Sequence, residues 1–165
     1  MNRLRSLRRS FACAMAGLWT AVCTQRNLRI HLAATCWAFW LGQQLKLDPS
    51  QLAVLLLTCA VVVIAELLNT AVEHLTDHLI PTRSENARAA KDTAAGAVLA
   101  SALFAVCVGV VLLWQPKELW ALVQRFVAVP TQLAILAICA ALSAWFVFFF
   151  GEALHSSKTD KQIKK

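Results

Sequence analysis

Four long apolar segments constrain the fold of this chain more than any other feature of its sequence. They cover about residues 30–45, 52–76, 89–114 and 131–150. Hydrophobic residues make up 59% of the 165 residues and charged residues only 15%, which is too apolar for the core of so small a soluble protein. A helix of about 20 residues crosses a bilayer. The sequence therefore predicts an all-α integral membrane protein with four transmembrane helices.

The segment before the first apolar run is basic and amphipathic. Apolar side chains recur at helical spacing between residues 3 and 24, and four arginines crowd the first turns. This pattern predicts a helix that lies on the membrane face with its arginines near the headgroups. A disordered basic tail is the alternative.

Lysine and arginine residues are distributed unequally between the two predicted sides of the membrane. Most lie in the N-terminal segment, in the loop after the second apolar run and in the C-terminal tail, whereas the other two loops hold Lys46, Lys117 and Arg125. Cytoplasmic loops carry the excess of positive charge in membrane proteins. We therefore expect both termini and the middle loop to be cytoplasmic, and we attribute the net charge of +7 to topology and anionic lipid, with no nucleic-acid partner.

The second apolar run ends in a series of polar residues. Glu66, Asn69, Glu73 and Asp77 follow one another at intervals of three or four, which places them on one face of a helix. A carboxylate within a spanning helix costs about 2.5–3.5 kcal/mol, whereas each Leu or Val returns about 0.3–0.6 kcal/mol. Such residues indicate an intramembrane functional site; a polar seam that joins helices is the alternative.

The third apolar run begins with Lys91 and Asp92, level with the polar end of the second run if the two helices are antiparallel. Lys91 could be an interfacial anchor whose ammonium group reaches the headgroups. Opposite the three acids, it instead indicates a site with carboxylates for a metal or a proton and a cation for phosphate.

These groups suit phosphoryl transfer, which needs a base, a positioned hydroxyl, a cation near the phosphates and Mg²⁺. The chain has no glycine-rich phosphate loop and only five glycines, so a nucleotide site would have to be built from helices. A small transporter or proton channel would also place acids inside the membrane, and a membrane scaffold without catalytic activity is a further alternative.

The same residues resemble the prokaryotic diacylglycerol kinase family, which consists of small integral-membrane lipid kinases. The resemblance covers about residues 6–114. It rests on four stretches, S-F-x-x-A-x-x-G at Ser10–Gly17, T-Q-R-N-L-R-I-H at Thr24–His31, A-E-L-L-N-T-A-V-E at Ala65–Glu73 and A-K-D-x-A-A-G-A-V-L at Ala90–Leu99.

The resemblance implies a homotrimer in the bacterial inner membrane, with cytoplasmic active sites shared between subunits. ATP would donate its γ-phosphate to the primary hydroxyl of a membrane lipid. The expected organisation is a surface helix at 1–29, a kinase core with three transmembrane helices at 30–114, a non-cytoplasmic loop at 115–130, an extra transmembrane helix at 131–150 and a basic tail at 151–165.

The resemblance also implies roles for individual residues. Glu66 matches the general base, Asn69 a residue that orients the site, and Glu73 a Mg²⁺-binding carboxylate. The residues matched to nucleotide contacts are Gln25, Glu73, Asp77, Thr82, Arg83, Ser84, Lys91 and Asp92.

This chain departs from the family pattern in two places. Gln25 stands where a second metal-binding carboxylate is expected, and an amide oxygen is a weaker Mg²⁺ ligand than a carboxylate, so an inactive relative is an alternative. The fourth apolar run and its basic tail lie beyond the three-helix core. The lipid substrate is expected to be diacylglycerol, with undecaprenol as the alternative indicated by the T-Q-R-N-L-R-I-H stretch.

Overall fold

The computed structural model describes residues 2–79 and 84–151, all of whose regular structure is helical. This confirms the all-α prediction. The helices are α1 (Asn2–Thr24), α2 (Arg26–Gln44), α3 (Pro49–Leu79), α4 (Glu85–Leu113), α5 (Pro116–Ala128) and α6 (Pro130–Phe148).

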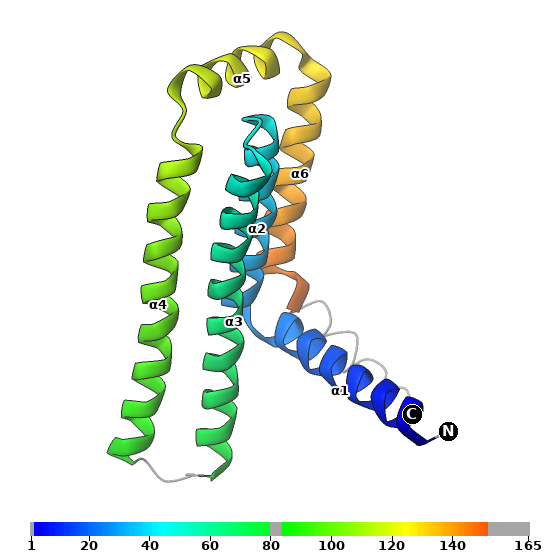
Figure 1. Cartoon of the computed structure of the whole chain (residues 1–165), viewed down its shortest axis with the longest axis vertical. Helices are drawn as coiled ribbons and strands as arrows, with labels where there is room; N and C mark the ends of the chain where they lie inside the picture. The colour runs from blue at the N-terminus through cyan, green and yellow to red at the C-terminus, as the bar shows by residue number, and fades with distance from the viewer. Residues whose placement is uncertain (1, 80–83, 152–165) are drawn as a thin grey trace.

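Four helices run along the long axis of the molecule, α5 crosses them at one end, and α1 leaves obliquely at the other end (Figure 1). The helix α3 packs mainly against α4 and α2, whereas α6 packs against α2 and α5. Few side chains are buried, and α4 buries none. The many exposed Leu, Val, Ile and Phe side chains are expected of a protein whose surroundings are lipid.

The turn between α2 and α3 is specified locally. Asp48 precedes Pro49, and its Oδ1 accepts the backbone N–H groups of Ser50 at 2.8 Å and Gln51 at 3.0 Å. Gln51 Oε1 in turn accepts the N–H of Asp48 at 3.0 Å. This reciprocal capping box, with proline at the first helical position, fixes where α3 begins.

Three helices are long and apolar enough to cross a membrane, namely α3 over Pro49–His78, α4 over Glu85–Leu113 and α6 over Pro130–Phe148. The helix α2 does not reach this standard, because Arg26, Arg29 and His31 lie in its first turns and leave a short apolar part. The expected count of four transmembrane helices is therefore not established, although the first apolar run is helical.

Two expected boundaries differ from the structure. Residues 115–130 were expected to form a loop, but residues 116–128 form the amphipathic helix α5. A search for long apolar runs misses such a helix, because charged residues interrupt its apolar positions. In addition, the predicted N-terminal helix over 3–24 is confirmed, but the chain breaks at Gln25, so residues 26–29 belong to α2 and not to the surface segment.

Arg29 joins three helix ends. It is buried, and its guanidinium donates to the carbonyl oxygens of Val22 at 2.9 Å and Cys23 at 3.2 Å in the last turn of α1, and of Val147 at 3.1 Å near the end of α6. A cation at helix C-termini interacts favourably with their unpaired carbonyls. Gly151 approaches this junction so closely that a Cβ there would lie 2.8 Å from the Cys23 carbonyl oxygen.

Candidate active site

The polar face predicted on the second apolar run lies on the second half of α3. Glu66, Asn69 and Thr70 are buried, Glu73 is half-buried and Asp77 is exposed. Access to water thus increases along the face from Glu66 to Asp77. Glu66 is only 2% exposed, so its carboxylate is screened from solvent, which strengthens any electrostatic interaction it makes.

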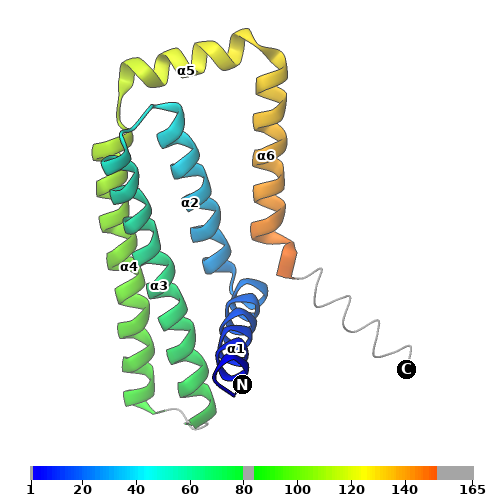
Figure 2. The ribbon, with the colours of Figure 1, turned by 45° about the vertical axis from the view of Figure 1, so that its right-hand side comes forward.

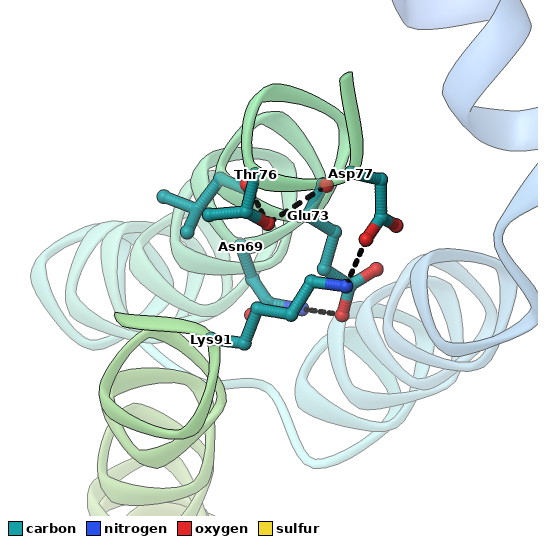
Figure 3. Close-up of polar contacts among 6 residues, drawn as sticks. Asn69, Glu73, Thr76, Asp77 and Lys91 are labelled. Carbon is teal, nitrogen blue, oxygen red and sulfur yellow. Dashed lines mark hydrogen bonds and ion pairs between the residues drawn. The ribbon is translucent and has the colours of Figure 1, made fainter. Parts of the chain in front are cut away.

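Asn69 links the buried and exposed parts of this face. Its Nδ2 donates a hydrogen bond of 2.9 Å to Glu73 Oε1 (Figure 3). Its Oδ1 is buried and has no hydrogen-bond partner in the part of the chain that the structure describes. A buried acceptor without a donor costs about 1–3 kcal/mol, so a donor or a cation supplied by a ligand would be stabilised at this oxygen.

Lys91 connects α4 to this face of α3. Its Nζ forms an ion pair with Asp77 Oδ1, and Figure 3 shows the lysine side chain reaching across from α4 toward Asp77 and Glu73. The prediction that the start of the third apolar run faces the polar end of the second is confirmed for this residue.

Asp92, by contrast, is turned to solvent. Its carboxylate lies 3.8 Å from the guanidinium of Arg88 one helical turn earlier, and both side chains are largely exposed. An exposed ion pair of this kind contributes little stability. Lys91 and Asp92 were expected to contact the nucleotide together, but the structure brings only Lys91 to the acids of α3.

Gln25 lies at the break between α1 and α2. Its backbone is extended, and its side chain makes no capping hydrogen bond. Among the described residues, no three or more His, Cys, Asp or Glu side chains gather as they would to hold a metal ion, and Gln25 is not hydrogen-bonded to Glu73, whose recorded side-chain partner is Asn69.

Three loop residues were expected to touch the nucleotide, and the structure describes one of them, Ser84. Thr82 and Arg83 lie outside the described residues. Ser84 immediately precedes α4, and its carbonyl oxygen accepts the N–H of Arg88 at 3.1 Å without a side-chain cap.

His31 borders this site and was not singled out by the sequence analysis. It lies on α2 and lines a cavity together with Cys59 and Val62 of α3, and Val62 is one helical turn before Glu66. His31 is the last residue of the T-Q-R-N-L-R-I-H stretch, and this position was the only available signal, because one histidine on an apolar helix does not by itself identify a site.

The segment that carries these residues is similar to known proteins. Residues 12–113 match the family model described as prokaryotic diacylglycerol kinase. The chain is 45% identical to a diacylglycerol kinase of Synechocystis sp. over 108 aligned residues. This alignment covers 65% of this chain and 62% of that protein. The chain is also 35% identical to an undecaprenol kinase of Bacillus subtilis over 116 aligned residues. This second alignment covers 70% of this chain and 94% of that protein.

The family match thus runs from the middle of α1 to the end of α4 and includes every residue of the polar face, but it ends before α5 and α6. The chain spans less than two thirds of the length of the Synechocystis relative. The resemblance drawn from the sequence is confirmed: this chain belongs to the prokaryotic diacylglycerol kinase family, a family of ATP-dependent membrane lipid kinases.

Proposed function

We propose that this protein transfers the γ-phosphate of ATP to the primary hydroxyl of a membrane lipid, and that diacylglycerol is the substrate, giving phosphatidic acid. The observation that carries this proposal is the buried Glu66 on a membrane helix, followed on the same face by the hydrogen-bonded Asn69–Glu73 pair and by the Asp77–Lys91 ion pair. All five residues fall within the segment that matches the kinase family.

Glu66 is the proposed general base. The lipid hydroxyl oxygen forms a bond to the γ-phosphorus while the bond from that phosphorus to the bridging oxygen of ADP breaks, and the hydroxyl proton passes to the Glu66 carboxylate. The screened position of Glu66 suits a base that must meet a hydroxyl at the membrane boundary. Asn69 is the proposed positioning residue, because its amide fixes Glu73 while its free oxygen can accept a further hydrogen bond.

Lys91 is the proposed phosphate contact. Phosphate oxygens would compete with Asp77 for its ammonium group, which is half-buried and therefore still accessible. Thr82, Arg83, Ser84 and Asp92 are proposed to complete the nucleotide site from the loop and the first turn of α4.

Mg²⁺ is proposed to bind at Glu73, with Gln25 as a weaker ligand. Oxygen donors suit this hard cation, and the Glu73 carboxylate and the free Asn69 Oδ1 supply them on one face of α3. Bound Mg²⁺ would neutralise charge on the phosphates. Because Gln25 carries no charge and is a weak Mg²⁺ ligand, the competing interpretation is that this protein is a catalytically inactive relative of the kinases.

Undecaprenol is the second candidate substrate. The matched relative from Bacillus subtilis is an undecaprenol kinase and is covered over 94% of its length. Diacylglycerol and undecaprenol both present a primary hydroxyl, so the same Glu66 chemistry serves either lipid.

The proposed arrangement is a homotrimer in a bacterial inner membrane, with four crossings by α2, α3, α4 and α6 and with the active site on the cytoplasmic side. The end of α3, the start of α4 and the end of α6 all lie toward the end of the molecule from which α1 emerges (Figure 1). This is the arrangement that four crossings require.

The test is lipid labelling by the purified full-length protein in lipid nanodiscs. ATP labelled at the γ-phosphate is supplied with Mg²⁺, and diacylglycerol and undecaprenol are offered in parallel. Label in diacylglycerol is expected. Label in undecaprenol alone would move the substrate assignment to the second candidate, and label in neither lipid from a folded sample would favour the inactive relative.

A further inference from the structure

A groove of about 480 Å³ lies between α2, α5 and α6, and none of the acids of α3 lines it. Its volume is within the range of about 300–1,000 Å³ typical of ligand sites. Figure 2 shows α2 and α6 side by side beneath α5. Two of its three walls come from helices outside the segment that matches the kinase family.

The walls of the groove are mainly aromatic and aliphatic. Trp37 and Trp40 on α2 meet edge to face with ring centroids 5.5 Å apart, and Trp40 lies 6.0 Å from Phe126 at the end of α5. Ile135 and Leu136 line the groove from α6. At its deep end, Trp37 Nε1 donates a hydrogen bond of 3.1 Å to Ser143 Oγ, which leaves an apolar interior.

The mouth of the groove is polar and positive. Arg125, Gln44 and Gln132 line it where α5 meets α6. Arg125 Nε donates to Gln132 Oε1 at 3.3 Å, and its guanidinium lies 6.0 Å from the Phe126 ring centroid. Among the described residues, no acid forms an ion pair with Arg125, so its charge is available to an anion.

The crossings by α4 and α6 under the proposed function place the mouth at a membrane boundary. The helix α5 connects the ends of α4 and α6, which both qualify as membrane-crossing helices. Since a helical residue advances about 1.5 Å, the groove extends for roughly 16 Å along α6 from Gln132 to Ser143. An apolar channel of this length that opens at the headgroup level beside an arginine is complementary to a lipid with an anionic phosphate headgroup.

We propose that this groove binds one anionic phospholipid, with its phosphate at Arg125 and one acyl chain between α2 and α6. Lipid binding here is separate from phosphoryl transfer, because no residue of α3 lines the groove.

The test is photo-crosslinking with phosphatidylglycerol that carries a diazirine in its acyl chain. The full-length protein is reconstituted in phosphatidylcholine vesicles that contain this probe, and labelled peptides are mapped by mass spectrometry. Labelling is expected to concentrate on residues 36–44 of α2 and 132–143 of α6. A phosphatidylcholine probe with the same chain should label these peptides about fivefold less.

Matched variants separate the groove from the general lipid-facing surface. Cys139→Phe fills the groove and should abolish the concentrated labelling, whereas Cys107→Phe on exposed α4 should leave it unchanged. Arg125→Gln should remove the preference for phosphatidylglycerol, whereas Lys117→Gln on the same helix should preserve it. Because Arg125 is exposed, its replacement is a test that does not disturb packing.

Three outcomes would overturn the proposal. Labelling spread evenly over α3, α4 and α6 would mean that the probe reports only bulk lipid. Equal labelling by the two headgroups in the unmodified protein would remove the role of Arg125. Efficient disulfide cross-linking of two copies through Cys139 would show that a second copy of the chain, and not a lipid, covers the groove.

Discussion

The unit formed by α2, α3 and α4 differs from the unit formed by α5 and α6 in both packing and chemistry. In the first unit, α3 is enclosed by two neighbours, and its buried positions include Glu66, Asn69 and Thr70. In the second, α6 packs against α2 and α5 and buries a single residue, Val147. The acids of the first unit lie on one helix face, whereas the second unit contributes Phe126, aliphatic side chains and Arg125 to the groove that it forms with α2.

This difference shows two ways in which helices associate in a membrane protein. The helix α3 can bury Glu66 because two neighbouring helices shield it from lipid. Directional contacts attach α6 to the rest of the molecule, namely the Arg29–Val147 and Trp37–Ser143 hydrogen bonds; they matter here because apolar burial gives little preference for protein over lipid.

The largest effect is expected when the proposed base of the three-helix unit, Glu66, is replaced. Glu66→Gln keeps the shape of the side chain but removes the proposed base, so kcat for lipid phosphorylation should fall by about 10²–10⁴-fold. The control is Glu118→Gln on exposed α5, which should retain full activity. Near-native kcat in Glu66→Gln, measured with labelled ATP, would refute the role of this carboxylate as the base.

The next effect concerns the junction between the two units. Arg29→Gln removes hydrogen bonds from a buried cation to α1 and α6, and it should lower the free energy of unfolding by about 1.5–3 kcal/mol. Arg26→Gln, an exposed position on the same helix turn, should change it by less than about 0.5 kcal/mol. Thermal or denaturant unfolding in detergent provides the measurement, and equal stability of the two variants would contradict the structural role of Arg29.

Replacement of Lys91 tests whether its ammonium group, which pairs with Asp77, also binds the phosphates of ATP. Lys91→Met should raise KM for ATP roughly 10- to 100-fold, because it removes a charged hydrogen bond to phosphate. Asp77→Asn removes only an accessible ion pair and should change KM by less than about fivefold. Steady-state kinetics with varied ATP measure both, and an unchanged KM in Lys91→Met would place the phosphates elsewhere.

A further prediction concerns Gln25 and the dependence of activity on Mg²⁺. Gln25→Glu should lower the Mg²⁺ concentration needed for half-maximal activity several-fold, because a carboxylate is a better ligand for this cation than an amide. Gln43→Glu at the far end of α2 is the matched control. If the two variants have the same Mg²⁺ titration, the break between α1 and α2 does not reach the metal.

The smallest effect concerns the start of α3. The N–H of Gln51, followed by that of Ser50, donates to the Asp48 carboxylate and holds its pKa below the ordinary value. A lowered folded-state pKa stabilises the cap fully above the unfolded value of about 3.9, and this stabilisation is lost as pH falls through the folded-state pKa.

Amide hydrogen exchange at Ser50 and Gln51 measures this cap. Protection should decrease in Asp48→Ala at neutral pH and in the unmodified protein at low pH. Asp48→Asn caps without a titrating group, so its protection should not change across the same pH range. A pH profile of Asp48→Asn that equals that of the unmodified protein would contradict the assignment.

Much of the fold follows directly from sequence pattern. The apolar runs at 52–76, 89–114 and 131–150 correspond to α3, α4 and α6, and the C-terminal ends of the last two runs agree with those of α4 and α6 to within two residues; the amphipathic segment at 3–24 is α1. Local rules also place the ends, since Pro49, Pro116 and Pro130 each begin a helix. The pattern failed for α5, whose short alternating composition is indistinguishable from a loop when only long apolar runs are sought.

The candidate site was predictable in part. Helical spacing alone placed Glu66, Asn69, Glu73 and Asp77 on one face. Spacing could not show that Asn69 bonds Glu73 while its oxygen stays free, or that Lys91 pairs with Asp77 while Asp92 turns to Arg88. These contacts depend on the relative rotation and height of α3 and α4, which neither helix encodes separately.

The sequence by itself determined the all-helical membrane class, the family and the polar face of α3, because hydropathy and helical periodicity act along one segment at a time. Only the tertiary structure decided that Arg29 ties α1 and α6 together, that His31 lines a cavity with Val62 of α3, and that α2, α5 and α6 line an aromatic groove with Arg125 at its mouth. Each of these features joins residues from separate helices, and their proximity follows from how the helices pack and not from their order along the chain.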